Sequence, residues 1–178
     1  FFSSPFDLTA VDFLEEMDVP AYKIASFEIN DIPMLKKIAK LGKPIILATG
    51  IAHLADIELA MKTCREAGNE NVILCERGIR SFETQTRFTL DLCGVAWLKE
   101  HCNLPVILDP SHAMGYAYGV ADLARACTAM GVDGLLIETH PTPCQAKSDA
   151  AQQLSHAQSE DMYMSIEPIA KAVGKTLV

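Results

Sequence analysis

The chain lacks several features that would point to a simple class of protein. Its six cysteines form no C-x-x-C pair, which argues against a zinc knuckle or a thioredoxin motif. No apolar run approaches the roughly 20 residues that span a bilayer, so we expect no membrane partner. Acidic residues outnumber basic ones, 23 to 15, and the formal net charge of -8 argues against nucleic acid as a partner.

The remaining composition is that of a globular protein. Hydrophobic residues make up 49% of the 178 residues and charged residues 21%, which predicts one packed domain over residues 1–178. We interpret the cysteines as reduced thiols and expect a cytoplasmic location. No basic segment of a signal peptide precedes the opening FFSSPFD. This stretch is typical of a strand already in progress, so we expect the chain to begin in the middle of a fold.

Short apolar runs alternate with segments of helical period. Each run is continuous, as in strands that are buried on both faces of a parallel sheet. The segments between them repeat apolar residues at helical spacing, as Ile57, Ala60, Met61 and Cys64 do. We expect strands at residues 1–4, 22–25, 44–48, 72–75, 106–109 and 134–138.

This alternation predicts right-handed βαβ units, arranged as an open doubly wound sheet or as a (β/α)8 barrel. No G-x-G-x-x-G follows the first run, which argues against a dinucleotide-binding fold. Polar residues follow at least four of the runs, as they do at the active-site rim of a barrel. A complete barrel needs about 250 residues. We therefore predict an α/β fold, a partial TIM barrel with strands 3 to 8 and without the first two βα units.

Three side chains near predicted strand ends form a candidate metal site. His112, Glu138 and Asp149 offer an imidazole and two carboxylates, a donor set that suits a divalent transition metal. Such a metal could polarise a carbonyl group as a Lewis acid. In the alternative interpretation His112 and Glu138 are capping or hydrogen-bonding groups at loop starts, and the spacing alone leaves both open.

Cationic residues supply a candidate anion site. Arg77 directly follows a strand and Arg80 follows it closely, and guanidinium groups bind phosphate or carboxylate in a bidentate manner. The alternative is a surface salt bridge to Glu76 or Glu83. Lys23 lies inside an apolar run, where a buried ammonium group needs an anionic partner.

Weaker candidates accompany these residues. Ser4 and Ser26 could donate hydrogen bonds to the same anion, although serines are common at strand ends. His140 could support Glu138 from behind or bind substrate, or it could be an ordinary loop residue before Pro141.

From about residue 69 onward the chain resembles the 3-deoxy-D-arabino-heptulosonate 7-phosphate (DAHP) synthases. The resemblance rests on GNENVILCERGIRSFETQTRFTLDL, LPVILDPSHAMG, GVDGLLIETHP and AKSDAAQQLS. It implies phosphoenolpyruvate and erythrose 4-phosphate as substrates in the shikimate pathway, together with a divalent metal (Mn, Fe, Co or Zn). It also implies that His112, Glu138 and Asp149 are metal ligands and that Arg77 of C-E-R-G contacts phosphoenolpyruvate.

Residues 1 to about 52 resemble instead the N-acetylneuraminate (sialic acid) synthases, through FFSSPFD and YKIASFE. That family also condenses phosphoenolpyruvate with an aldose on a similar barrel. The resemblance implies that Lys23 binds phosphoenolpyruvate and that Ser26 and Ser4 match the family's serine or threonine positions. Neither resemblance is complete, because Ala48-Thr49 stands where a DAHP synthase carries Lys-Arg, and no cysteine matches that family's cysteine metal ligand.

The sequence therefore predicts a phosphoenolpyruvate-dependent aldol-type synthase with small-molecule substrates, nearest to DAHP synthase. Sialic acid synthase is the alternative activity, and a chimera or a fragment of two related half-barrels would explain both resemblances. A third interpretation is a non-catalytic half-barrel whose exposed sheet edges favour self-association, so we expect a homo-oligomer. If the front of the barrel is absent from the molecule, we expect very weak turnover or none.

Overall fold

Strands and helices alternate along the whole chain, as the hydrophobic pattern predicts. The computed structural model describes residues 1–178 and contains five strands and seven α-helices. It divides into two units, Phe1–Cys75 and Glu76–Val178. Every strand pairing within a unit is parallel, so the prediction of a parallel α/β fold is confirmed.

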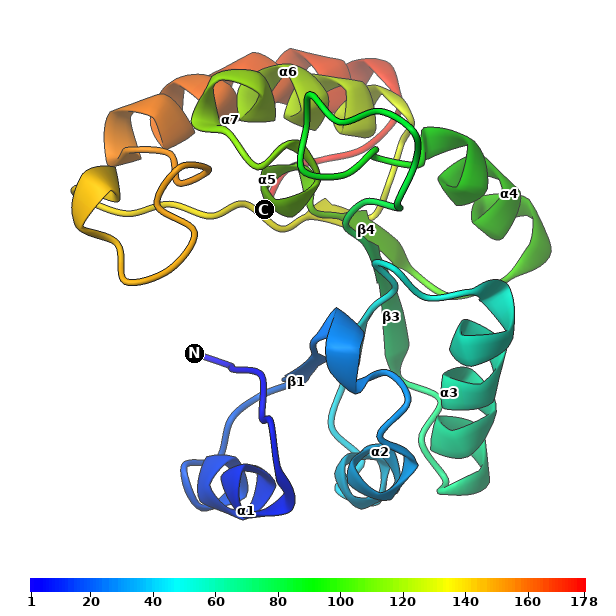
Figure 1. Cartoon of the computed structure of the whole chain (residues 1–178). Coiled ribbons are helices and arrows are strands. Elements are labelled where there is room, and N and C mark those ends of the chain that lie inside the picture. Colours follow the sequence, from blue (N-terminus) through cyan, green and yellow to red (C-terminus); the bar gives the residue numbers. More distant parts are fainter. The chain divides into compact units, whose positions relative to one another are not determined.

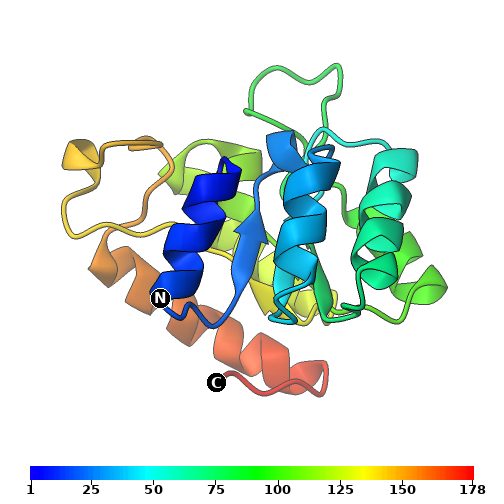
Figure 2. The same ribbon diagram turned by 90° about the horizontal axis from the view of Figure 1, so that it is seen from below.

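The first unit is a three-stranded parallel arrangement with helical connections. In its register Lys23 lies opposite Ile46, which lies opposite Ile73. The three helices lie side by side along this unit (Figure 2). Its elements are α1 (Leu8–Glu16), β1 (Tyr22–Ile24), the 3-10 turn η1 (Ser26–Glu28), α2 (Ile32–Ala39), β2 (Ile45–Ala48), α3 (Leu54–Glu66) and β3 (Val72–Glu76), of which the last residue belongs to the second unit.

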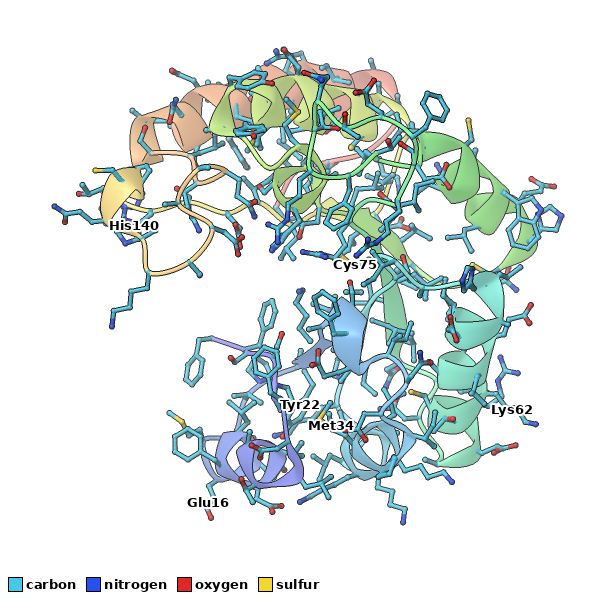
Figure 3. The ribbon with its side chains drawn as sticks, viewed as in Figure 1. Glu16, Tyr22, Met34, Lys62, Cys75 and His140 are labelled. Carbon is cyan, nitrogen blue, oxygen red and sulfur yellow. The ribbon has the colours of Figure 1, made fainter.

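The core of the first unit lies between its strands and its helices. Tyr22 and Met34 point into this layer and are fully buried, whereas Glu16 and Lys62 project outward (Figure 3). All four residues of β2 are buried, because a parallel strand covered on both faces has no solvent side. The buried Tyr22 hydroxyl donates to Glu15 Oε2 at 2.8 Å, so its polar end is satisfied.

The strand predicted at residues 1–4 is reduced to a single bridge. Only Ser3 pairs with Tyr22, in parallel, and the Lys23 N–H donates to the Ser3 carbonyl at 3.1 Å. Pro5 follows the predicted strand directly and offers no N–H to extend the ladder of backbone hydrogen bonds. The direction of the predicted strand is therefore right, but its length is wrong.

The second unit combines two short strands with four α-helices. Helices α6 and α7 pack side by side (Figure 1), over a core that contains Val120, Leu154 and Ile166. No helix of the chain combines the length and apolar character needed to cross a membrane. The elements are α4 (Leu92–His101), β4 (Val106–Leu108), α5 (Pro110–Met114), α6 (Ala117–Ala129), β5 (Gly134–Leu135), the 3-10 turn η2 (Pro143–Gln145) and α7 (His156–Ala172).

The last strand is also shorter than predicted. Strand β5 ends at Leu135, although the Leu136 N–H still donates to the Leu108 carbonyl at 2.8 Å. Beyond it the backbone pairs with Leu154, whose N–H donates to the Glu138 carbonyl at 3.0 Å. This change of partner moves Glu138 from the end of a strand to a loop that is held by a second loop.

Candidate active site with a metal-binding cluster

His112 is carried by the five-residue helix α5, which directly follows β4. Asp109 caps this helix by accepting from the His112 N–H at 3.0 Å, and Pro110 supplies a first-turn residue that needs no N–H partner. Gly115 ends the helix in the left-handed region, with a φ of +76°. The D-P-S-H sequence thus turns the end of a strand into one short, capped helix.

Asp109 also determines which nitrogen of His112 is available. Its fully buried side chain places Oδ2 2.6 Å from His112 Nδ1. Because a carboxylate only accepts hydrogen bonds, the proton belongs on Nδ1, and Nε2 keeps its lone pair. A neutral imidazole with a free Nε2 is the form that binds a metal.

Glu138 and Asp149 come from the two loops that follow β5. The Glu138 N–H donates to the buried Ser111 hydroxyl at 3.0 Å, which ties the first loop to α5. Asp149 adopts a φ of +50°, a left-handed conformation that aspartate tolerates better than most residues. Such conformations gather at functional sites, where the surroundings hold them in place.

The structure brings these three predicted ligands together. One ligating atom from each lies within 4.8 Å of the others, and His112 Nε2 lies 3.5 Å from Glu138 Oε1 and 3.9 Å from Asp149 Oδ2. The side chains are 14%, 24% and 29% exposed respectively, which leaves an open side for substrate or water. One imidazole and two carboxylates suit Mn²⁺, Fe²⁺, Co²⁺ or Zn²⁺, so these residues fit a divalent metal.

Two residues that sequence reasoning missed contact the outer sides of the carboxylates. Gln152 Nε2 donates to Glu138 Oε2 at 2.6 Å, and Arg87 Nη1 donates to Asp149 Oδ1 at 2.7 Å. Both lie in loops, at 65 residues from each other in the chain, and no motif or strand end marks them. A search for polar residues close to the S-D stretch would have found Gln152 but not Arg87.

Glu76 ends strand β3, Arg77 follows it directly, and both are buried. Burial raises the pKa of Glu76 to about 7, although its Oε1 accepts from the Gly78 N–H at 2.6 Å. Its other oxygen, Oε2, is buried and has no hydrogen-bond partner. The C-E-R-G motif therefore places a guanidinium group and a weakly acidic carboxyl group side by side in the chain.

Arg80 is exposed, in contrast to Arg77. It lines an open depression of about 450 Å³ together with Arg87 and Phe88. Gly78, at a φ of +108°, has no room for a side chain, because a Cβ there would lie 2.5 Å from the Phe88 Cβ. The glycine thus lets this loop pack on the rest of its own unit.

Lys23, Ser26 and Ser4 belong to the first unit. The Lys23 side chain is half-buried on β1 and Ser4 is partly exposed, whereas Ser26 is 4% exposed and its Oγ has no hydrogen-bond partner. A buried hydroxyl without a partner costs free energy in a folded protein. Substrate contact by these three residues stays a prediction.

His140 lies on the loop that leads into η2 (Figure 3). Its Nδ1 accepts from the Thr142 N–H at 3.0 Å, and its own N–H donates to the Leu154 carbonyl at 2.9 Å. These bonds give the residue a local role in a turn. Its predicted contact with substrate stays untested.

Parallel βα units with polar side chains in the loops after their strands are typical of one class, the enzymes of the α/β barrel type. The sequence matches the DAHP synthetase I family over residues 8–174, and the chain belongs to this family. The match extends through both halves that the sequence motifs had assigned to different relatives.

Individual relatives agree with this assignment. The chain is 34% identical, over 85% of its length, to a phospho-2-dehydro-3-deoxyheptonate aldolase of Thermotoga maritima, of which it covers 45%. It is 32% identical, over 98% of its length, to an N,N'-diacetyllegionaminic acid synthase of Campylobacter jejuni, of which it covers 50%. The chain thus spans about half the length of the curated relatives it matches.

The fold agrees as well. A crystal structure of the Thermotoga maritima DAHP synthase matches 99% of this chain and 52% of its own, with a TM-score of 0.95 at 29% identity. The prediction of an α/β fold of the TIM-barrel type, which spans about half of a DAHP synthase chain, is therefore confirmed. Curated relatives that match the chain carry the names of aldolases and synthases.

Proposed function

We propose that this chain carries the metal-binding half of a DAHP synthase-like enzyme, which condenses phosphoenolpyruvate with erythrose 4-phosphate. The observation that supports this most directly is the cluster of His112, Glu138 and Asp149, whose ligating atoms lie within 4.8 Å of one another. A divalent metal bound there would polarise the carbonyl oxygen of the acceptor aldehyde.

In the proposed reaction, C3 of phosphoenolpyruvate forms a bond with the aldehyde carbon of the acceptor. Water adds to C2, and the C–O bond to phosphate breaks, so that inorganic phosphate leaves. Arg77 would bind the anionic donor, because a buried guanidinium group offers several donors in one plane. Holding the donor in one orientation lowers the entropy cost of bringing the two carbons together.

Lys23, Ser26, Ser4, Arg80 and His140 are proposed substrate contacts with weaker support. For Ser26 the support is its buried and unpartnered hydroxyl, which a substrate oxygen would satisfy. For Lys23 it is the position on an otherwise buried strand, and for Arg80 it is the depression that it lines.

The metal is tested by measuring how much Mn²⁺ the purified 178-residue chain binds. We expect one equivalent for the wild type and loss of binding for His112→Ala. His156→Ala, at the exposed start of α7, is the matched control and should bind as the wild type does. Equal metal content in His112→Ala and the wild type would contradict the site.

The reaction is tested by phosphate release from phosphoenolpyruvate in the presence of metal. Release with erythrose 4-phosphate supports the proposed activity. Release with N-acetylmannosamine instead would support the second candidate, a sialic acid synthase-like activity, which the similarity to the legionaminic acid synthase favours. Metal binding without release from either acceptor would leave a half-barrel that is inactive alone, and a mass measurement in solution would then show whether copies associate.

A further inference from the structure

Gln152 is a buried amide that joins two sides of the metal-binding cluster. It is 2% exposed, its Nε2 donates to Glu138 Oε2 at 2.6 Å, and its Oε1 accepts from Arg87 Nη1 at 3.0 Å. A carboxylate only accepts and a guanidinium group only donates, so these partners permit a single orientation of the amide. The amide therefore holds the outer oxygen of Glu138 in one place.

Arg87 holds the second carboxylate from the same side. The Nη1 group that contacts Gln152 also donates to Asp149 Oδ1 at 2.7 Å. The backbone N–H of Arg87 donates to the Met114 carbonyl at 3.2 Å, at the end of the helix that carries His112. A Cβ at Gly115 would lie 2.6 Å from the Arg87 Cβ, so the absent side chain at this position makes room for the arginine.

These contacts divide the carboxylate oxygens into two sets. The outer oxygens, Glu138 Oε2 and Asp149 Oδ1, are bound by Gln152 and Arg87, and Gln153 Nε2 adds a longer contact of 3.4 Å to Glu138 Oε2. The other oxygens, Glu138 Oε1 and Asp149 Oδ2, are those that lie 3.5 and 3.9 Å from His112 Nε2. Each carboxylate is thus turned so that one oxygen remains for a cation.

We propose that Arg87 and Gln152 act as one positioning pair, which orients Glu138 and Asp149 for metal binding. This inference rests on the proposed metal site and extends it to two residues outside the ligand set. The alternative is that Arg87 forms only a partly exposed ion pair with Asp149, with side chains 41% and 29% exposed. Such a pair contributes little, and it would not account for the buried amide that links Arg87 to Glu138.

The direction in which the metal affinity changes when Arg87 is removed separates these alternatives. A guanidinium group repels a divalent cation, so if Arg87 acted by its charge alone, its removal would tighten metal binding. If it positions the carboxylates, its removal weakens binding, as loss of residues behind metal ligands commonly does by about 10- to 100-fold.

The test is a calorimetric titration of the metal-free 178-residue chain with Mn²⁺. We expect Arg87→Ala and Gln152→Leu each to raise the Kd about 10- to 100-fold at an unchanged stoichiometry, and Arg87→Lys to fall in between. Arg125→Ala is the matched control, because Arg125 donates to Ser165 on α7 and contacts none of the ligands. In the double variant the loss should be smaller than the product of the two single losses, because both residues act through one contact.

Outcomes against the proposal are distinct from those against the proposed function. If the wild type binds Mn²⁺ and His112→Ala does not, unchanged or tighter binding by Arg87→Ala and Gln152→Leu overturns the positioning pair alone. If the wild type itself binds no Mn²⁺, the metal site and the positioning pair are both overturned.

Discussion

Two groups of polar residues in this chain differ in how completely their hydrogen bonds are made. Around the metal-binding cluster, Asp109 binds the inner nitrogen of His112, and Gln152 and Arg87 bind the outer oxygens of the two carboxylates. By contrast, Ser26, Glu28 and Glu76 each keep a buried oxygen without a partner. We refer to these atoms, Ser26 Oγ, Glu28 Oε2 and Glu76 Oε2, as the unpartnered oxygens.

Under the proposed function, the difference corresponds to two kinds of task. Metal ligands must be held in one geometry before the metal arrives, so the groups behind them are fully bonded. A group that binds a passing substrate must keep hydrogen-bonding capacity free for it. Buried polar atoms without partners are rare and costly, so the unpartnered oxygens mark positions where stability and function can conflict.

The largest expected effect concerns Glu76. Burial raises its pKa to about 7 from the ordinary value of 4.5, so the unfolded chain loses this proton at a lower pH than the folded chain does. Stability should therefore fall as pH rises from about 4.5 to about 7, by about 3 kcal/mol in total. Glu76→Gln removes the ionisable group and should remove this part of the pH dependence.

The measurement is urea unfolding of both proteins at about pH 5 and about pH 8. The difference in unfolding free energy between Glu76→Gln and the wild type should favour the variant more at the higher pH. A difference that is the same at both values would show that Glu76 is ionised as easily in the folded chain as in the unfolded one.

A smaller effect is expected for Asp109→Asn. The asparagine oxygen can still accept from the His112 N–H and cap α5, but the side chain no longer offers a second oxygen to Nδ1. The imidazole then loses the partner that fixes its tautomer, and Mn²⁺ affinity should fall about 10- to 100-fold. Calorimetric titration gives the affinity, and thermal unfolding shows whether the cap survives.

Asp133→Asn is the matched control for that change. Asp133 Oδ2 accepts from the Val106 N–H at 2.9 Å, away from the cluster. This variant should bind Mn²⁺ as the wild type does. Equal metal affinities for Asp109→Asn and Asp133→Asn would show that Asp109 has no role beyond capping.

The smallest effect compares two buried serines. The Ser111 hydroxyl accepts from the Glu138 N–H, so Ser111→Ala leaves a donor unsatisfied and should cost about 1 to 2 kcal/mol. The Ser26 hydroxyl has no partner, so Ser26→Ala should change stability by no more than about 0.5 kcal/mol. Denaturant unfolding measures both, and equal costs would mean that Ser26 is bonded in the folded protein.

Much of the fold was predictable, because continuous apolar runs of strand length alternate with helical periods. The residues at which strands begin and end were less predictable. Residues 1–4 and 134–138 read as strands, but only Ser3 pairs in the first, and the second keeps no bond to β4 beyond Leu136. The pattern of apolar residues indicates which segments are buried. It does not indicate where the backbone changes from one hydrogen-bonding partner to another.

The cluster itself was predictable to the extent that strand ends converge. His112 and Glu138 follow parallel neighbours, β4 and β5, whose carboxyl ends share one edge. Asp149 was proposed as a carboxylate in the following loop, and the resemblance to the family's S-D motif supported it. Arg87 and Gln152 were not predicted, because their contacts depend on the paths of three loops, which no local pattern specifies.

The helix that carries His112 has one further consequence. Helix α5 has only five residues, far fewer than a helix needs to persist by itself in water. Its helical form depends on Asp109 before it, on Gly115 after it and on the loop that is hydrogen-bonded to its last turn. For the proposed metal site, changes in these flanking segments should therefore alter the affinity for a cation, even where every ligand stays the same.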